Sequence, residues 1–215
     1  MDRQTMIRGL GALGFALAFT ACAESLNLDA TGDLTMTMQR TGSSLFAPQQ
    51  SASGSQAVAP DTVDAFIVTV AAVQVQHSST DSANAASWST IQLRSPVRVN
   101  LMALGTSDDS ARVIAQGRVE AGSYTRIRLV LSNPTIRFKG DVSFGLGTVL
   151  EGGVDYGVLL AGGQQSVEID AAVDVEAGAS SQSIVHLCFD QAASLGSVSI
   201  AGTGQVLLTA VFNER

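Results

Sequence analysis

The stretch that decides the fold is Val113-Ile-Ala-Gln-Gly-Arg-Val-Glu-Ala-Gly-Ser-Tyr-Thr-Arg-Ile-Arg-Leu129, near the middle of the chain. Toward its end, apolar and charged residues alternate, so a strand would place aliphatic side chains on one face and arginines on the other. The aliphatic side chains are Ile127, Leu129 and Leu131, and the arginines are Arg126 and Arg128. A period of two is typical of a strand that is buried on one face only.

A turn interrupts this stretch at residues 121–125. Gly122 supplies a backbone conformation that its neighbours would resist, because glycine has no Cβ atom. Tyr124 then opens the second strand, and a tyrosine at a sandwich corner can hydrogen-bond back to the preceding loop. We therefore predict structural roles for Gly122 and Tyr124 at a strand–turn–strand corner.

The same alternation recurs along the chain, and glycine, serine, asparagine and aspartate occupy almost every gap between the runs. No long helix is predicted beyond the N-terminal segment, and no segment repeats at a fixed period. This pattern predicts an all-β fold, a single antiparallel β-sandwich of about seven to nine strands. The expected strands are 34–38, 66–77, 88–94, 97–101, 112–119, 124–131, 135–139, 156–160, 167–175, 184–189, 198–200 and 205–212.

Composition narrows the class of protein. The chain has 215 residues and a formal charge of −7, and Lys139 is its only lysine. Such a chain lacks the clustered positive charge that nucleic-acid binding needs. Its two cysteines are too few for a disulfide-dense scaffold or a cysteine-based zinc ribbon. With 46% apolar residues it is not a disordered chain, and its length suits one domain with a sizeable core.

Residues 1–21 have the pattern of a helical secretory signal. Arg3 and Arg8 precede an apolar run of about 15 residues, which is shorter than a membrane-spanning helix requires. The end of this segment, Phe19-Thr20-Ala21-Cys22, resembles the signal of bacterial lipoproteins. The alternative is an ordinary secretory signal that is cut after Ala21 or Ala23.

The lipoprotein resemblance implies that Cys22 is lipidated and that the chain is bound to a membrane through this anchor. Residues 22–31 would then form a short tether to a sandwich domain at 32–213. Ala23 and Glu24 follow the cysteine, and no aspartate stands there. This arrangement resembles the signal for the outer membrane in enteric-type sorting.

Three segments are expected to be loops, because each is polar or rich in glycine and proline. They are a flexible connection at 41–62, a hairpin tip at 78–87 and a glycine-rich hairpin with irregular ends at 140–163. Loops on a rigid sandwich usually carry function. We therefore expect a protein or glycan partner to bind through these loops.

The order of several features resembles a known family. The features are the start Gly32-Asp33-Leu34, the valine-rich run that ends at His77, Trp88, the pair Asn100-Leu101, the turn 121–125 and the pair Phe189-Asp190. They resemble the bacterial lipoprotein family catalogued as domain of unknown function 4382. The resemblance implies a transthyretin-like (prealbumin-like) sandwich on a lipid anchor, and it implies no activity because the family's function is unassigned.

His186, Cys188 and Asp190 are the strongest candidates for a metal site. They are two residues apart, so a strand would place all three on one face, and each is a possible zinc ligand. Neighbours on one face of a strand are about 7 Å apart, which is wide for one ion. We therefore favour a buried structural strand with a small, inert Cys188, and we predict no cofactor.

Glu168, Asp170, Asp174 and Glu176 share the polar face of one expected strand. Paired carboxylates that hydrolyse glycosides lie across a cleft, whereas these follow one edge. Arg126 and Arg128 are expected to pair with the acids across neighbouring strands. Weak calcium binding by this face stays open.

No nucleophile elbow and no recognisable catalytic partner for either histidine is present in the sequence. We therefore expect a cell-envelope lipoprotein, not an enzyme, that acts as a binding or structural module. The alternative is an envelope protein that binds carbohydrate or another small ligand. Scarce aromatic residues, 5% of the chain, argue against the sugar platform.

Overall fold

Extended chain dominates the computed structural model, which describes residues 31–41, 55–78, 88–145, 147–160, 165–201 and 204–215. Its strands are β1 Thr31–Arg40, β2 Val63–His77, β3 Trp88–Ile91, β4 Val97–Asn100, β5 Arg112–Glu120, β6 Gly122–Phe138, β7 Val142–Phe144, β8 Thr148–Leu150, β9 Asp155–Leu160, β10 Ser166–Val175, β11 Gly178–Phe189, β12 Ser199–Ile200, β13 Val206–Leu208 and β14 Phe212–Glu214. The helical elements are α1 Gln191–Leu195 and the 3-10 turns η2 Pro60–Thr62, η3 Leu101–Ala103 and η4 Asp108–Ser110. Within these described ranges, none of the helices has the length and apolar character to cross a membrane.

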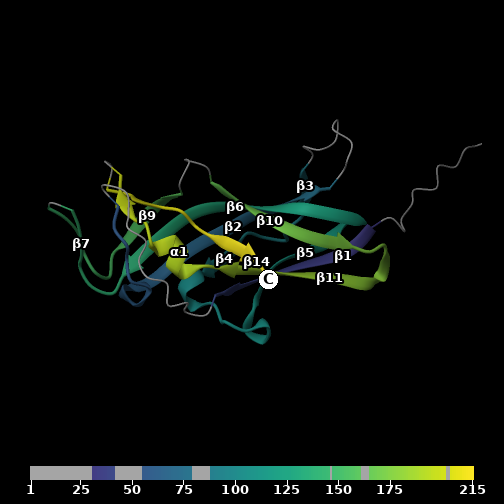
Figure 1. The fold of residues 1–215 in the computed structure, drawn as a ribbon, viewed down its shortest axis with the longest axis horizontal. Helices are drawn as coiled ribbons and strands as arrows, with labels where there is room; N and C mark the ends of the chain where they lie inside the picture. The colour runs from purple at the N-terminus through teal and green to yellow at the C-terminus, as the bar shows by residue number, and fades with distance from the viewer. Residues whose placement is uncertain (1–30, 42–54, 79–87, 146, 161–164, 202–203) are drawn as a thin grey trace, which may run out of the picture.

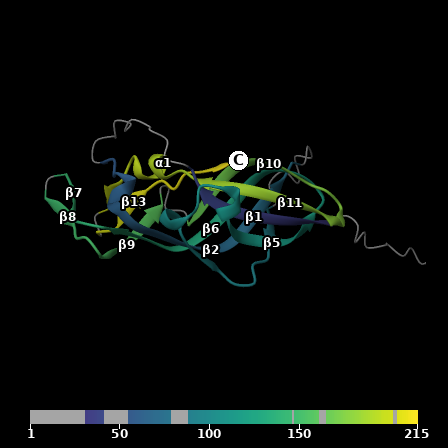
Figure 2. The same cartoon turned by 90° about the horizontal axis from the view of Figure 1, so that it is seen from below.

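Two sheets pack face to face along the long axis of the molecule (Figures 1 and 2). One has the order β14-β11-β1-β5. The other has the order β12-β13-β9-β6-β2-β3, with β10 added to β6 and β4 added to β2, and β7 and β8 form a separate hairpin. The predicted all-β sandwich is confirmed.

The sequence predicts an antiparallel sandwich, and most strand pairs are antiparallel, but two are parallel. β1 pairs in parallel with β11, and β9 pairs in parallel with β13. Parallel neighbours are joined by long crossovers. Alternation within a strand does not show which strand it will pair with, so the sequence pattern could not reveal these two pairs.

The core lies between the two sheets and follows the predicted alternation. Leu34, Met36 and Met38 of β1 are fully buried, as are Ile127, Leu129 and Leu131 of β6. β1 lies between β5 and β11, and its other face is nearly as buried, at Thr35, Thr37 and Gln39. β1 is therefore an interior strand that carries polar side chains on its outward face.

β6 is one continuous strand where the sequence predicted two, at 124–131 and 135–139. The chain passes through a β-bulge: Ile67 of β2 faces Thr135, and Thr69 faces Ser132. Asn133 takes the extra position with φ at 47°, a conformation that asparagine tolerates. A bulge also accommodates Pro134, which cannot donate to the ladder. The predicted break was therefore wrong.

The second half of segment 41–62, which the sequence predicts to be a flexible loop, packs against the rest of the fold. Val58 lies in the core with 5% exposure, and its N–H donates to the carbonyl of Leu195 at 2.8 Å. Gln56 exchanges two backbone hydrogen bonds with Val198, and η2 closes the segment. One apolar residue among serine and glutamine gives too weak a pattern to reveal this packing. Residues 42–54 lie outside the described part.

The expected strand at 205–212 is divided between the sheets. β13 joins β9 in one sheet, and β14 joins β11 in the other, so the chain crosses the sandwich edge at 209–211. Within the glycine-rich segment 140–163, β7 and β8 pair and form the predicted hairpin.

The long axis gives the sandwich two poles (Figure 1). Thr31, the start of β6 and the turn between β10 and β11 lie at one pole, since Gly32 pairs with Gly178 and Gly122 pairs with Val175. The β7–β8 hairpin lies at the opposite pole. The chain enters the described fold at one pole, and its glycine-rich hairpin projects from the other.

Candidate functional site

The outer face of the larger sheet carries two aligned rows of side chains that cross β3, β2, β6 and β10. The register places one row at Thr90, Gln74, Arg128 and Glu168 and the other at Trp88, Gln76, Arg126 and Asp170. We call these eight residues the polar grid. The residues between them in β2 and β6, Val75 and Ile127, are fully buried, so alternation alone directs the grid outward.

Arg128 joins the four strands of the grid. Its Nε and Nη2 donate to Glu168 Oε1 at 3.1 and 2.6 Å, and its Nη1 donates to Gln74 Oε1 at 3.4 Å. Its guanidinium also lies over the Trp88 ring, 3.9 Å from the ring centre. Gln74 in turn donates to Thr90 Oγ1 at 3.3 Å. A continuous chain of contacts therefore crosses the face.

Arg126 holds the second row. Its Nε lies 3.2 Å from Asp170 Oδ1, and its Nη1 lies 3.9 Å from Glu168 Oε2. The predicted cross-strand pairing of the two arginines with the acids is confirmed. Asp174 instead accepts a hydrogen bond from Ser123. Within the described ranges, no three His, Cys, Asp or Glu side chains are grouped to hold a metal ion.

The predicted corner at Gly122 and Tyr124 lies beside the polar grid, at the pole where Thr31 begins the described fold (the entry pole). Gly122 has φ at 150°, and the Tyr124 hydroxyl donates to the carbonyl of Glu120 at 2.6 Å. Tyr124 is 1% exposed, and His77 packs against its ring at a centroid distance of 5.0 Å. Burial, and after it the charge of Glu120, raises the pKa of Tyr124. The hydrogen bond of Tyr124 therefore links the start of β6 to the end of β5.

His186, Cys188 and Asp190 do not form one site. His186 Nδ1 lies 2.8 Å from the hydroxyl of Thr37, and Cys188 Sγ accepts a hydrogen bond from Gln39 at 3.3 Å. Asp190 lies beyond the end of β11 and accepts from the N–H of Ala193, so it caps α1. Each of the three side chains has its own structural partner.

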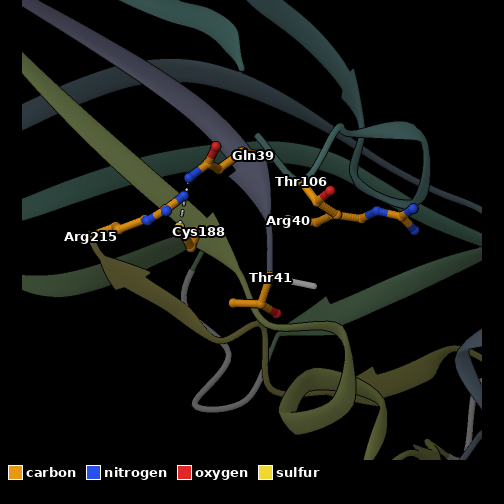
Figure 3. A pocket seen from close by; sticks show the side chains of 6 residues that line it. All are labelled: Gln39, Arg40, Thr41, Thr106, Cys188 and Arg215. Atoms are coloured by element: carbon orange, nitrogen blue, oxygen red, sulfur yellow. Dashed lines mark hydrogen bonds between the residues drawn. The ribbon is translucent and has the colours of Figure 1, made fainter. Parts of the chain in front are cut away.

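A pocket of about 290 Å³ lies at the end of β1, lined by Gln39, Arg40, Thr41, Thr106, Cys188 and Arg215 (Figure 3). Arg215 extends toward Gln39 and Cys188, whereas the Arg40 side chain extends away from them. Arg215 pairs with Asp108 at 3.2 Å. With its amide turned over, Gln39 instead accepts from Arg215 and donates to Ser107 and Asp108, in place of its hydrogen bond to Cys188. The ion pair joins Arg215 to η4, whereas the buried Nε of the pocket residue Arg40 has no hydrogen-bond partner in the described part of the chain.

Comparison with known protein families shows which family the chain belongs to. The model of the family described as Domain of unknown function (DUF4382) matches residues 57–210, which is most of the chain. The chain belongs to this family. The matched part includes the whole polar grid and the Gly122–Tyr124 corner, whereas β1 and β14 of the DUF4382 protein lie outside it. No curated protein and no solved structure matches the chain.

The residues that suggested DUF4382 hold the fold. Asn100 Oδ1 accepts from the N–H groups of Phe66 and Met102, so it caps η3 and ties it to β2. Phe189 packs edge-on against Phe66 in the core. Of these residues, Trp88 also belongs to the polar grid. The opening Gly32-Asp33-Leu34 precedes the matched part of the DUF4382 domain.

The sequence predicted the ion pairs of Arg126 and Arg128 with the carboxylates, but it did not show that residues of β2 and β3 line up with them in the polar grid. The available signal was Gln74 and Gln76, two polar residues at alternate positions in an otherwise valine-rich strand. Their register with Trp88 and Thr90 depends on a pairing that spans residues 79–87, which the structure does not describe. Cys22 and the predicted segment 1–21 also lie outside the described residues.

Proposed function

We propose that this DUF4382 protein is a lipid-anchored protein of the bacterial cell envelope whose sandwich is a non-catalytic binding module. The single observation that carries the proposal is the Phe19-Thr20-Ala21-Cys22 sequence, because it follows a charged start and a short apolar run. Ala23 and Glu24, in place of an aspartate, favour the outer membrane as its destination.

The fold suits such an anchor. Cys22 precedes the first described strand by nine residues, so a fully extended tether reaches at most about 30 Å. The entry pole at Thr31 would therefore stay close to the bilayer, and the β7–β8 hairpin at the other pole would face away from it. Two or more acyl chains on the cysteine give stable attachment, whereas one alone anchors marginally.

Binding of a carbohydrate, as opposed to a protein, is favoured by a specific observation. The polar grid presents amide, guanidinium, carboxylate, hydroxyl and indole groups side by side on a sheet face. Its side chains are already held by one another, which is what a preformed binding surface requires. The proposed partner surface therefore includes this sheet face in addition to the loops.

The anchor is tested with Cys22→Ser in a bacterial host with two membranes. The wild-type chain is expected in the membrane fraction after a high-salt wash and to incorporate labelled palmitate, while Cys22→Ser is expected in the soluble periplasmic fraction. Cys188→Ser is the matched control, since its thiol is buried, and it should stay with the membranes. Cys22→Ser protein that still pellets after the wash would refute the anchor.

A further inference from the structure

We propose that the polar grid binds a neutral oligosaccharide that lies across the strands from Trp88 toward Glu168 and Asp170. The proposal rests on the proposed function of the sandwich as a binding module, and it specifies the surface and the ligand class. Three properties of the grid carry it: its charge balance, its spacing and its rigidity.

The charge balance selects a neutral ligand. The two guanidinium groups of Arg126 and Arg128 are matched by the carboxylates of Glu168 and Asp170 at 2.6–3.9 Å. A polyanion such as nucleic acid would find no excess of positive charge to displace its counterions. A sugar hydroxyl both donates and accepts, so it suits a surface on which donors and acceptors alternate. The Asp170 side chain is 91% exposed and keeps acceptor capacity toward solvent.

The spacing matches a linear sugar chain. Neighbouring strands lie about 4.8 Å apart, which is close to the length of one pyranose residue. Each row crosses four strands, so it spans about 14 Å, the length of roughly three sugar residues. A ligand that crosses the strands therefore meets a new polar side chain at each residue.

The grid is held before any ligand arrives. Arg128 is fixed by Glu168, Gln74 and the Trp88 ring at once, and Gln74 is fixed by Thr90. Beneath them, Val73, Val75 and Ile127 are fully buried in the core. Arg128 and Gln74 therefore have little side-chain freedom left to lose on binding, which favours affinity. Trp88 ends one row, and because the Arg128 guanidinium covers one face of its ring, a sugar would contact the edge or the other face of the indole.

Trp88 makes the proposal directly measurable. It is the only tryptophan in the chain, so intrinsic fluorescence reports on the grid. The full chain in detergent micelles is titrated with cellohexaose, maltohexaose, xylohexaose and chitohexaose. We expect a saturable change in fluorescence with at least one of them. The matching trisaccharide should bind nearly as well, and the monosaccharide about tenfold more weakly or worse, because the rows span roughly three residues.

Two variants separate binding from stability. Gln74→Ala and Arg126→Ala remove grid groups whose partners are at the surface, so both should fold as the wild type does and weaken the sugar about tenfold or more. Arg118→Ala is the matched control, since Arg118 forms an exposed ion pair with Asp33 on the other sheet. It should bind with unchanged affinity.

Two results would overturn the proposal. One is no saturable change with any of the four hexasaccharides up to about 10 mM, a concentration that would detect even millimolar affinity. The other is an unchanged affinity in both folded grid variants. Neither result bears on the anchor, because the Cys22→Ser fractionation is independent of sugar. Failure of the sugar site and failure of the proposed location are therefore distinguishable.

Discussion

Replacing Gly122 with valine should destabilise the corner between β5 and β6. Two separate effects act at this position. Gly122 has φ at 150°, a conformation that residues with a Cβ atom rarely adopt. A Cβ atom built there would lie 2.3 Å from Nε2 and 2.8 Å from Cε1 of His77, so the imidazole must move.

The cost can be estimated from these two effects. Holding a non-glycine residue in this conformation costs about 1–3 kcal/mol. Displacing His77 from the Tyr124 ring, 5.0 Å away, sacrifices about 0.5–1.5 kcal/mol of aromatic contact. The free energy of unfolding should therefore fall by about 2–4 kcal/mol, because partial relaxation of the half-buried His77 removes some of the sum. A chain of this size should then melt roughly 5–15 °C lower.

Urea unfolding followed by circular dichroism measures this change. Gly140→Ala is the matched control, because a Cβ atom there meets nothing within 4 Å, and it should not destabilise the chain. Introducing Gly122→Ala together with His77→Ala removes the clash and leaves the backbone strain alone. A Gly122→Val protein whose free energy of unfolding lies within about 0.5 kcal/mol of the wild type would refute the corner as described.

Two further changes test neighbouring features of the fold. Tyr124→Phe should cost about 0.5–1.5 kcal/mol, because the carbonyl of Glu120 loses the hydroxyl that donates to it. The pKa of Tyr124 is raised in the folded state, so the protonated hydroxyl stabilises the fold fully below pH 10, and this stabilisation is lost as the pH rises further. Between pH 9 and 11, the free energy of unfolding should therefore fall less steeply in Tyr124→Phe than in the wild type. Val58→Ala should lower the free energy of unfolding in urea by about 1–3 kcal/mol, and a change near zero would place Val58 outside the core.

Local chemistry was readable from the sequence wherever a feature depended on a few adjacent residues. The Gly122–Tyr124 corner needs one glycine and one tyrosine at a fixed spacing, and both the positive φ and the hydrogen bond to Glu120 are present. The pairing of Arg126 and Arg128 with carboxylates required only that two alternating strands be neighbours.

Features that depend on distant partners were not readable. Val58 is one apolar side chain in a polar segment, and its place in the core is set by the α1 region, where it bonds the carbonyl of Leu195. The bulge at Asn133 is fixed by its register against β2, so the local sequence reads as a break. The polar grid needs four strands in one register, and no single strand contains that information.

The interior position of β1 determines when the fold can form. Its outward side chains bond to residues 147–149 positions later, as Thr35 does with Gln182 and Gln39 with Cys188. Such non-local contacts slow folding, since a long loop must close before they stabilise anything. β1 can pair with β5 once residues 112–120 are present, but its other neighbour, β11, comes only at 178–189, when nearly nine-tenths of the chain has been passed. β14 then completes the smaller sheet from residues 212–214, so for the N-terminus-first export that the proposed lipoprotein signal implies, this sheet would form last.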